Sequence, residues 1–389
     1  MQKVSRKESP VSTLFNYEIN NDELQIGLDG SEQEEYYLDI AKNTIVAAIM
    51  LFYMNDGGKR LKRIKIRVDK SKYKNIIRFL QNQRILFDLD IELPEVDINT
   101  KYEFKDEWLS GIIRAQKVSE VDIENIRGKL LKKGIQQKHI DKLQYYESIS
   151  SPIQISYKGY RVAEIDSLGN IEAVNNKGME LSKWVEYLIV SRSDPNDEHY
   201  YHVKEEHYLE SVILEKIYSR TGWQTGGIAI KSLFDKQSVA FQFPVLLYSG
   251  KSSSKANHPK YIDVIAKSDG RPVIMELKVW GKTKSRGKYL FDAFGQIFNY
   301  YCYIYRLHKQ EDRKFNDIKS LSGIYDWTKP ILYVVTNDIR EDETAFKFRT
   351  LIEKILGHLK NNIIMHFVEI DNSLWGQKRE ISIYRDICN

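Results

Sequence analysis

Two apolar segments with three ionisable residues inside them lie between residues 261 and 280. The first reads YIDVIA and the second PVIMELKVW, and the residues between them include SDGR, a sequence typical of a tight turn. A β-hairpin is therefore expected, with Asp263 on the first strand and both Glu276 and Lys278 on one face of the second. Because an unpaired buried charge is costly, these residues need a chemical reason to lie in strands that otherwise belong to a core.

A divalent cation supplies such a reason. Mg²⁺, or Mn²⁺ in its place, binds a few carboxylate oxygens together with water and phosphate oxygens. We expect Asp263 and Glu276, with the main-chain carbonyl of Leu277, to hold a cation that binds a scissile phosphate and activates water. Lys278 then orients the water or neutralises the charge that develops on phosphorus. The alternative is a surface hairpin in which the same residues form a cross-strand ion pair.

The order of these residues is similar to a known signature. Asp263, preceded by isoleucine where the signature has proline, and the triplet Glu276, Leu277 and Lys278 resemble the motif of the PD-(D/E)XK nuclease superfamily. The resemblance implies that Asp263, Glu276 and Lys278 are catalytic. It also implies an α/β fold, with a restriction-endonuclease-like mixed sheet flanked by helices in the C-terminal half and a separate N-terminal α+β domain.

Two further elements fit the same superfamily. The helical pattern DAFGQIFNYYCYIY places Gln296 and Tyr300 four residues apart and resembles the Q-x-x-x-Y element of many members. By that resemblance, Gln296 orients the catalytic lysine or the substrate phosphate. Glu210, in the upstream helical pattern HYLESVILEKIYSR, matches the acidic residue that helps to hold a metal or its water, although Glu215 on the same helix competes for this assignment.

Within this superfamily, residues from about 190 to 389 resemble the nuclease domain of the Shedu antiphage defence proteins. The segments that carry the likeness are YIDVIA, VIMELKVW and DAFGQIFNYY. The resemblance implies a magnesium-dependent endonuclease that cuts phage DNA, at or near the ends of linear DNA. It further implies a homo-oligomer, with a tetramer favoured. Regulation by the N-terminal domain is expected because residues 1–150 contain no comparable carboxylate-lysine hairpin.

The chain of 389 residues is too long for one ordinary core. We predict a sensor, regulatory or DNA-binding domain at residues 1–150, connecting strands at 151–190 and the nuclease domain at 191–389. The first boundary is placed at residue 150 because the segment SISSP at residues 148–152 resembles a linker.

Two segments of the N-terminal half carry secondary-structure patterns. Residues 118–146 predict a helical hairpin that is broken at Gly134, with the second helix over Gln137–Tyr146. The apolar run Asn43–Met54 predicts a buried helix or strand.

Basic residues concentrate in two places. Residues 59–74 contain nine lysines and arginines, and the alternation over residues 61–68 predicts a strand with one cationic face. More basic residues flank the acidic hairpin on both sides, which favours nucleic acid over a small metabolite. The expected phosphate contacts are Lys59, Arg60, Lys62, Arg63 and Lys65 in the first place and Lys282, Lys284 and Arg286 in the second. A solvated edge strand or loop is the alternative for both.

Other features narrow the class of protein. No run of about twenty apolar residues is present to span a membrane. Cys302 and Cys388 are too far apart in sequence for a CxxC pair, which disfavours a zinc site or a disulfide framework and favours a cytoplasmic location. Three other functions stay open: a restriction-type endonuclease with an N-terminal specificity domain, a nucleotide-activated CRISPR accessory nuclease, and a DNA-binding protein without catalytic activity.

Overall fold

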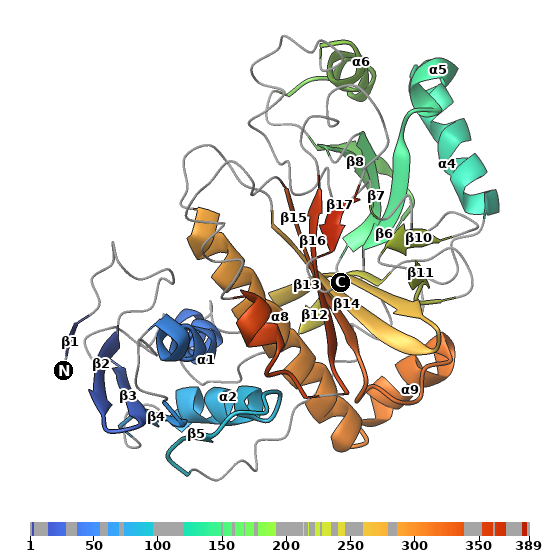
Figure 1. Cartoon of the computed structure of the whole chain (residues 1–389). Coiled ribbons are helices and arrows are strands. Elements are labelled where there is room, and N and C mark those ends of the chain that lie inside the picture. The colour runs from blue at the N-terminus through green and yellow to red at the C-terminus, as the bar shows by residue number, and fades with distance from the viewer. Residues whose placement is uncertain are drawn as a thin grey trace.

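The described part of the chain folds into a mixed α/β structure, in which the strands form three β-sheets, of five, four and eight strands (Figure 1). The mixed α/β class agrees with the expectation from the sequence. The computed structural model describes residues 2–3, 15–28, 37–54, 61–69, 74–95, 120–148, 151–157, 160–166, 168–174, 178–191, 213, 217, 222–225, 228–234, 240–245, 260–278, 286–337, 352–360, 362–370 and 383–386.

The eight-stranded sheet contains the predicted hairpin. Its order is β10-β11-β13-β14-β15-β16-β17, with β12 also beside β13. Strands β14, β15 and β16 run parallel, and the other neighbours are antiparallel. Asp269 and Gly270 join β13 to β14 with φ angles of 45° and 74°, as a two-residue turn of type I′ requires. The strands are β10 (Trp223–Thr225), β11 (Ile228–Ser232), β12 (Ala240–Val245), β13 (Lys260–Ser268), β14 (Arg271–Lys278), β15 (Ile331–Asn337), β16 (Ile364–Ile370) and β17 (Ile383–Asp386).

The two faces of this sheet belong to different cores. Helix α8 (Arg286–Lys309) packs on β14 and β15, and α9 (Arg313–Ser322) packs beside α8. On β14, Met275 and Leu277 contribute to one core, whereas Ile274 contributes to the core that contains α8. Since side chains alternate along a strand, Glu276 and Lys278 lie on the α8 face.

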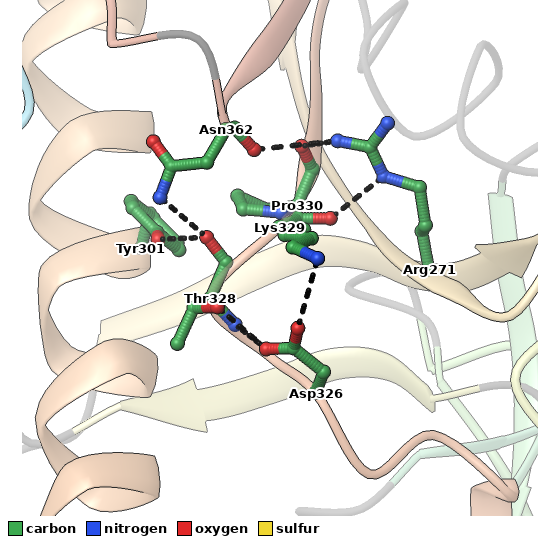
Figure 2. A network of polar contacts seen from close by, with 7 residues as sticks. All are labelled: Arg271, Tyr301, Asp326, Thr328, Lys329, Pro330 and Asn362. Carbon is green, nitrogen blue, oxygen red and sulfur yellow. Dashed lines mark hydrogen bonds and ion pairs between the residues drawn. The ribbon is translucent and has the colours of Figure 1, made fainter.

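Side chains bind the main chain where the parallel strands begin (Figure 2). The guanidinium of Arg271, at the start of β14, donates to the carbonyl oxygens of Lys329, Pro330 and Asn362 over 2.8, 3.2 and 3.3 Å. Tyr301 Oη of α8 and Asn362 Nδ2 donate to the Thr328 carbonyl over 3.1 and 3.0 Å. These bonds fix the starting ends of the three strands and the position of α8. The carboxyl ends of the same strands lie at the opposite edge.

The N-terminal unit is built into the same core as α8. Its strand order is β1-β2-β3-β4-β5, with β3, β4 and β5 parallel. Helices α1 and α2 both pack on α8, and one hydrophobic cluster extends from Leu24 in β3 through Phe298 in α8 to Phe367 in β16. The elements are β1 (Gln2–Lys3), β2 (Phe15–Asn20), β3 (Glu23–Leu28), α1 (Tyr37–Met54), β4 (Arg63–Arg67), α2 (Lys74–Arg84) and β5 (Ile91–Glu92).

Helix α1 contains the apolar run that the sequence analysis assigned to a buried helix or strand. Ile45 and Ile49 are fully buried in the core that α1 shares with α8. Among the described residues, no helix combines the length and the apolar character that crossing a membrane requires.

A third unit, residues 120–191, has a separate core. Its four strands pair in the order β6-β7-β8-β9, and its hydrophobic cluster contains only residues from Ile126 to Ile189. The elements are α4 (Glu120–Lys132), α5 (Gln137–Ile140), β6 (Gln144–Ser148), β7 (Ser151–Tyr157), β8 (Tyr160–Ile165), β9 (Ile171–Ala173) and α6 (Leu181–Ser191). The predicted division at residue 150 passes between β6 and β7, which pair with each other.

The helical hairpin that was expected over residues 118–146 is only partly present. Gly134 ends the first helix with a φ of 83°, as predicted. The predicted second helix over Gln137–Tyr146 is wrong in its length, because α5 stops at Ile140 and residues 144–148 form β6. Antiparallel pairing with β7 satisfies the main chain of this segment, so the extended form prevails over the helical one.

Candidate active site

Three of the predicted site residues lie on the two strands of the hairpin. Val264 of β13 pairs with Met275 of β14, and Asp263 and Glu276 are the next residues along these strands. Glu276 is fully buried, whereas Asp263 is half-buried. The fold therefore brings a carboxylate from each strand to one end of the hairpin, at the carboxyl end of β14.

Lys278 and Glu276 form an ion pair. Lys278 Nζ lies 2.5 Å from Glu276 Oε1, and the side chains are 12% and 0% exposed. The two residues thus lie on one face, as the period of two predicts. Because a buried carboxylate is costly without a partner, this ammonium compensates part of the cost of burying Glu276.

Asp263 is oriented by the main chain of the facing strand. Its Oδ2 accepts a hydrogen bond from the Leu277 main-chain N–H over 2.7 Å. The bond ties the Asp263 carboxylate to the peptide group that joins Glu276 to Leu277.

Helix α8 carries the predicted amide across from these strands. Gln296 Nε2 donates to Tyr300 Oη over 2.5 Å, so the two residues lie on one face of the helix as expected. Tyr300 is 1% exposed, and Gln296 is half-buried. Since α8 packs on β14, the helix that carries Gln296 covers the strand that carries Glu276 and Lys278.

The structure adds a residue that the sequence analysis missed. Thr336 of β15 stands beside Lys278 in the parallel register and is fully buried. A polar residue at the carboxyl end of an apolar strand, in the segment ILYVVTN, is a signal that could have identified it.

Several predicted residues have no described side chain. Glu210 and Glu215 fall outside the described residues, as do Lys59, Arg60, Lys282 and Lys284. Arg286 is the first residue of α8, ten residues before Gln296. The roles predicted for these residues stay predictions.

The basic face of β4 is paired with carboxylates. The ion pairs are Lys62 with Asp22 (2.9 Å), Arg63 with Glu23 (2.5 Å), Arg67 with Glu18 (3.6 Å) and Lys65 with Glu92. The hydrogen bond from Lys62 lowers the pKa of Asp22, and the hydrogen bond from Lys65 lowers the pKa of Glu92. Four cations thus meet four carboxylates on this sheet face. Phosphate contact by Lys62, Arg63 and Lys65 stays a prediction, but these side chains already have anionic partners.

The donor set at the hairpin suits a hard divalent cation. It consists of the carboxylates of Asp263 and Glu276, with the Leu277 carbonyl as the predicted third donor. Two carboxylates and one ammonium leave a net negative charge, which a cation would offset. Within the described residues no three histidine, cysteine or acidic side chains form a metal-binding group. A site of two carboxylates is compatible with Mg²⁺, which usually takes one or two carboxylates together with water and substrate phosphates.

Comparison with known proteins gives no match: no family model, no curated protein and no solved structure is similar to this chain. The functional argument therefore depends on the residues and their arrangement.

Proposed function

We propose that this protein is a metal-dependent DNA endonuclease of the PD-(D/E)XK type. The observation that carries the proposal is the arrangement of Asp263, Glu276 and Lys278 at one end of a hairpin. Helix α8, with Gln296 and Tyr300, packs on β14, the strand that carries Glu276 and Lys278. The residues match the superfamily signature in type and order, and their contacts support a shared role.

Each side chain has a defined part in phosphodiester hydrolysis. Asp263 and Glu276, with the Leu277 carbonyl, would hold Mg²⁺ or Mn²⁺, which supplies Lewis-acid activation of the phosphate and of water. The hydrogen bond from Leu277 N–H fixes the direction of the Asp263 carboxylate. The ammonium group of Lys278 forms an ion pair with Glu276, and the side chain is 12% exposed. Lys278 can therefore also orient water or stabilise charge on the phosphate.

Gln296 is proposed as a positioning residue. Its amide donates to Tyr300, which limits the rotation of the amide about the side chain. In this orientation Gln296 would align Lys278 or the substrate phosphate. The restriction-endonuclease-like fold belongs to the same proposal, and it is supported by an antiparallel hairpin that continues into the parallel strands β14, β15 and β16.

The biological role that we propose is antiphage defence of the Shedu kind, by a homo-oligomer, with a tetramer favoured, that cuts invading DNA. Regulation by the N-terminal unit has physical support. Gln83 of α2 donates to Asn299 of α8, and Asn299 lies between Gln296 and Tyr300 in sequence. A displacement of α2 would therefore act on the helix that carries the proposed positioning residue.

The proposal is tested by incubating the purified protein with linear, circular and single-stranded DNA in Mg²⁺, Mn²⁺, Ca²⁺ or EDTA. Cleavage is expected in Mg²⁺ and Mn²⁺. Ca²⁺ and EDTA are expected to stop it, because Ca²⁺ accepts looser coordination and misplaces the attacking water. Robust cleavage in excess EDTA would exclude the metal mechanism. DNA binding without cleavage in any metal would favour the non-catalytic alternative.

A further inference from the structure

The corner between α4 and α5 gathers exposed lysines. Residues 129–142 contain five lysines and one aspartate. The lysine corner is defined as Lys132, Lys133, Lys138 and Lys142, and all four side chains are exposed. Lys132 and Lys133 lie at the end of α4, and Lys138 and Lys142 lie four residues apart in α5 and the turn that follows it.

These lysines differ from the basic residues of β4 in their partners. Every described cation of the β4 face, from Lys62 to Arg67, is paired with a carboxylate. In contrast, none of the lysine corner residues forms an ion pair with any residue that the structure describes. The nearest acidic residue in sequence, Asp141, accepts a hydrogen bond from Gln137 over 2.7 Å. The net positive charge is therefore greater at the corner than on the β4 face, although each has four basic residues.

Stability of the fold explains only part of this cluster. A lysine in the last turn of a helix interacts favourably with the helix dipole, which accounts for Lys132. Lys133, Lys138 and Lys142 lie beyond the end of α4. The last carbonyls of α4 are also satisfied by the main chain, since Leu130 O accepts from Ile135 N–H and Leu131 O accepts from Gly134 N–H. Capping of α4 therefore does not require these three ammonium groups, although Lys138 lies in the last turn of the four-residue helix α5.

The electrostatic field of the corner reaches a buried neighbour. Burial holds the pKa of His139 below its ordinary value, and the charges of Lys138 and Lys142 add to this effect. Glu186 of α6 opposes it. Both lysines thus lie close enough to His139 for their charges to act on it.

The corner is connected to the candidate active site by a short path. Strand β6 begins two residues after Lys142, and β6 packs against β12. Strand β12 pairs with β13, with Phe243 opposite Ile262, the residue before Asp263. The unit that carries the lysines therefore packs against β12, the neighbour of the strand that carries a proposed metal ligand.

We infer that the lysine corner binds the phosphate backbone of the duplex DNA on which the nuclease site acts. This inference rests on the proposed function and names a DNA-contacting surface outside the nuclease sheet. Charge complementarity carries it: four unpaired ammonium groups on one exposed corner suit closely spaced phosphates, and such contacts are independent of base sequence.

The test neutralises the four lysines and uses a control of equal charge. The variant carries Lys132→Gln, Lys133→Gln, Lys138→Gln and Lys142→Gln. The control carries the same change at four exposed lysines elsewhere, which are Lys183, Lys231, Lys309 and Lys360. Affinity for a labelled linear duplex is measured in Ca²⁺ over a series of salt concentrations, and cleavage by the wild type in Mg²⁺ is measured in parallel.

Loss of four phosphate contacts is expected to weaken binding by about a hundredfold at about 0.15 M salt. It should also reduce the slope of log affinity against log salt by about three to four. The control variant should keep the wild-type slope. The inference is overturned if the corner variant keeps the affinity and the salt slope of the wild type. If the wild type cuts DNA in the same experiment, the proposed function stays intact.

A wild type that neither binds nor cuts DNA would overturn the proposed function and this inference with it. Exposed Leu131 and Leu168, at 45% and 84%, lie on the same unit and make an anionic lipid surface the competing partner. Vesicles of phosphatidylserine and phosphatidylcholine test this competitor. If the corner variant loses vesicle binding but keeps the wild-type affinity for DNA, the surface binds membranes and the inference is wrong.

Discussion

The two units that precede the eight-stranded sheet in the chain are attached to it in different ways. The N-terminal unit shares one continuous core with α8, whereas residues 120–191 have a core of their own. Polar contacts follow the same division, because Asn82 and Gln83 bond to Arg306 and Asn299 of α8. The segment furthest from the candidate site in sequence is therefore the one built into the helix that covers the site. Distance along the chain does not predict structural independence.

The largest effect is expected from a cavity in the shared core. Phe298 is fully buried, and its ring centroid lies 5.0 Å from that of Phe87 and 6.2 Å from that of Phe294. Phe298→Ala should lower the free energy of unfolding by about 3–5 kcal/mol. Native-state hydrogen exchange should show faster exchange in α1 and α2 as well as in β14 and β15, since all of them pack around α8.

The matched change in the separate core is Leu130→Ala. Leu130 is fully buried in the cluster of residues 120–191, and its truncation should cost about 2–5 kcal/mol. Faster exchange should then be confined to residues 120–191, the unit that shares this core. The comparison fails if Phe298→Ala leaves α1 and α2 protected, or if Leu130→Ala increases exchange in α8.

A smaller effect is expected at the polar contact between α2 and α8. Asn299→Ala removes the acceptor for the buried Gln83 amide, at a cost of about 1–3 kcal/mol. A double-mutant cycle with Gln83→Ala should give a coupling free energy of about 0.5–3 kcal/mol. Additive effects of the two substitutions would show that this contact does not join the N-terminal unit to α8.

The smallest effect is a pH dependence confined to the third unit. Burial lowers the pKa of His139, so the folded unit excludes a proton that the unfolded chain binds at its ordinary pKa. The free energy of unfolding is therefore not reduced by His139 above about pH 6.5, and it falls as the pH drops below that value and the unfolded chain binds the proton. Exchange protection of β6 to β9 should therefore be lower at about pH 5.5 than at about pH 7.5, and His139→Phe should reduce the difference. An unchanged pH dependence in His139→Phe would exclude this cause.

The hairpin could be predicted because its signals are local. The apolar run around Glu276 and the Asp269-Gly270 turn predict the strands and the turn, and the two-residue period places Glu276 and Lys278 on one face. The contact between Lys278 and Glu276 and the pairing of Gln296 with Tyr300 follow from the periods of two and 3.6 residues. Local periodicity therefore fixes which of these side chains share a face.

Other features depend on residues that are distant in sequence. The basic alternation of β4 is visible in the sequence, but its ion pairs with Glu18, Asp22 and Glu92 come from pairing with other strands. Thr336 becomes a neighbour of Lys278 only through the parallel register of β14 and β15. The packing of α1 on α8 has no local signal either, since an apolar helix can bury its surface against any apolar partner.

The central claim is that the Asp263 carboxylate holds a catalytic metal, and one pair of variants tests it most directly. In Asp263→Asn the amide oxygen can still accept the hydrogen bond from Leu277 N–H, but the negative charge is lost. Asp269→Asn removes a carboxylate from the exposed turn of the same hairpin, at a positive φ that asparagine tolerates. The measurement is the initial rate of duplex cleavage in Mg²⁺, with thermal unfolding as the control for folding. We predict a loss of at least about a hundredfold for Asp263→Asn and a wild-type rate for Asp269→Asn. A folded Asp263→Asn protein that cuts at the wild-type rate would contradict the account.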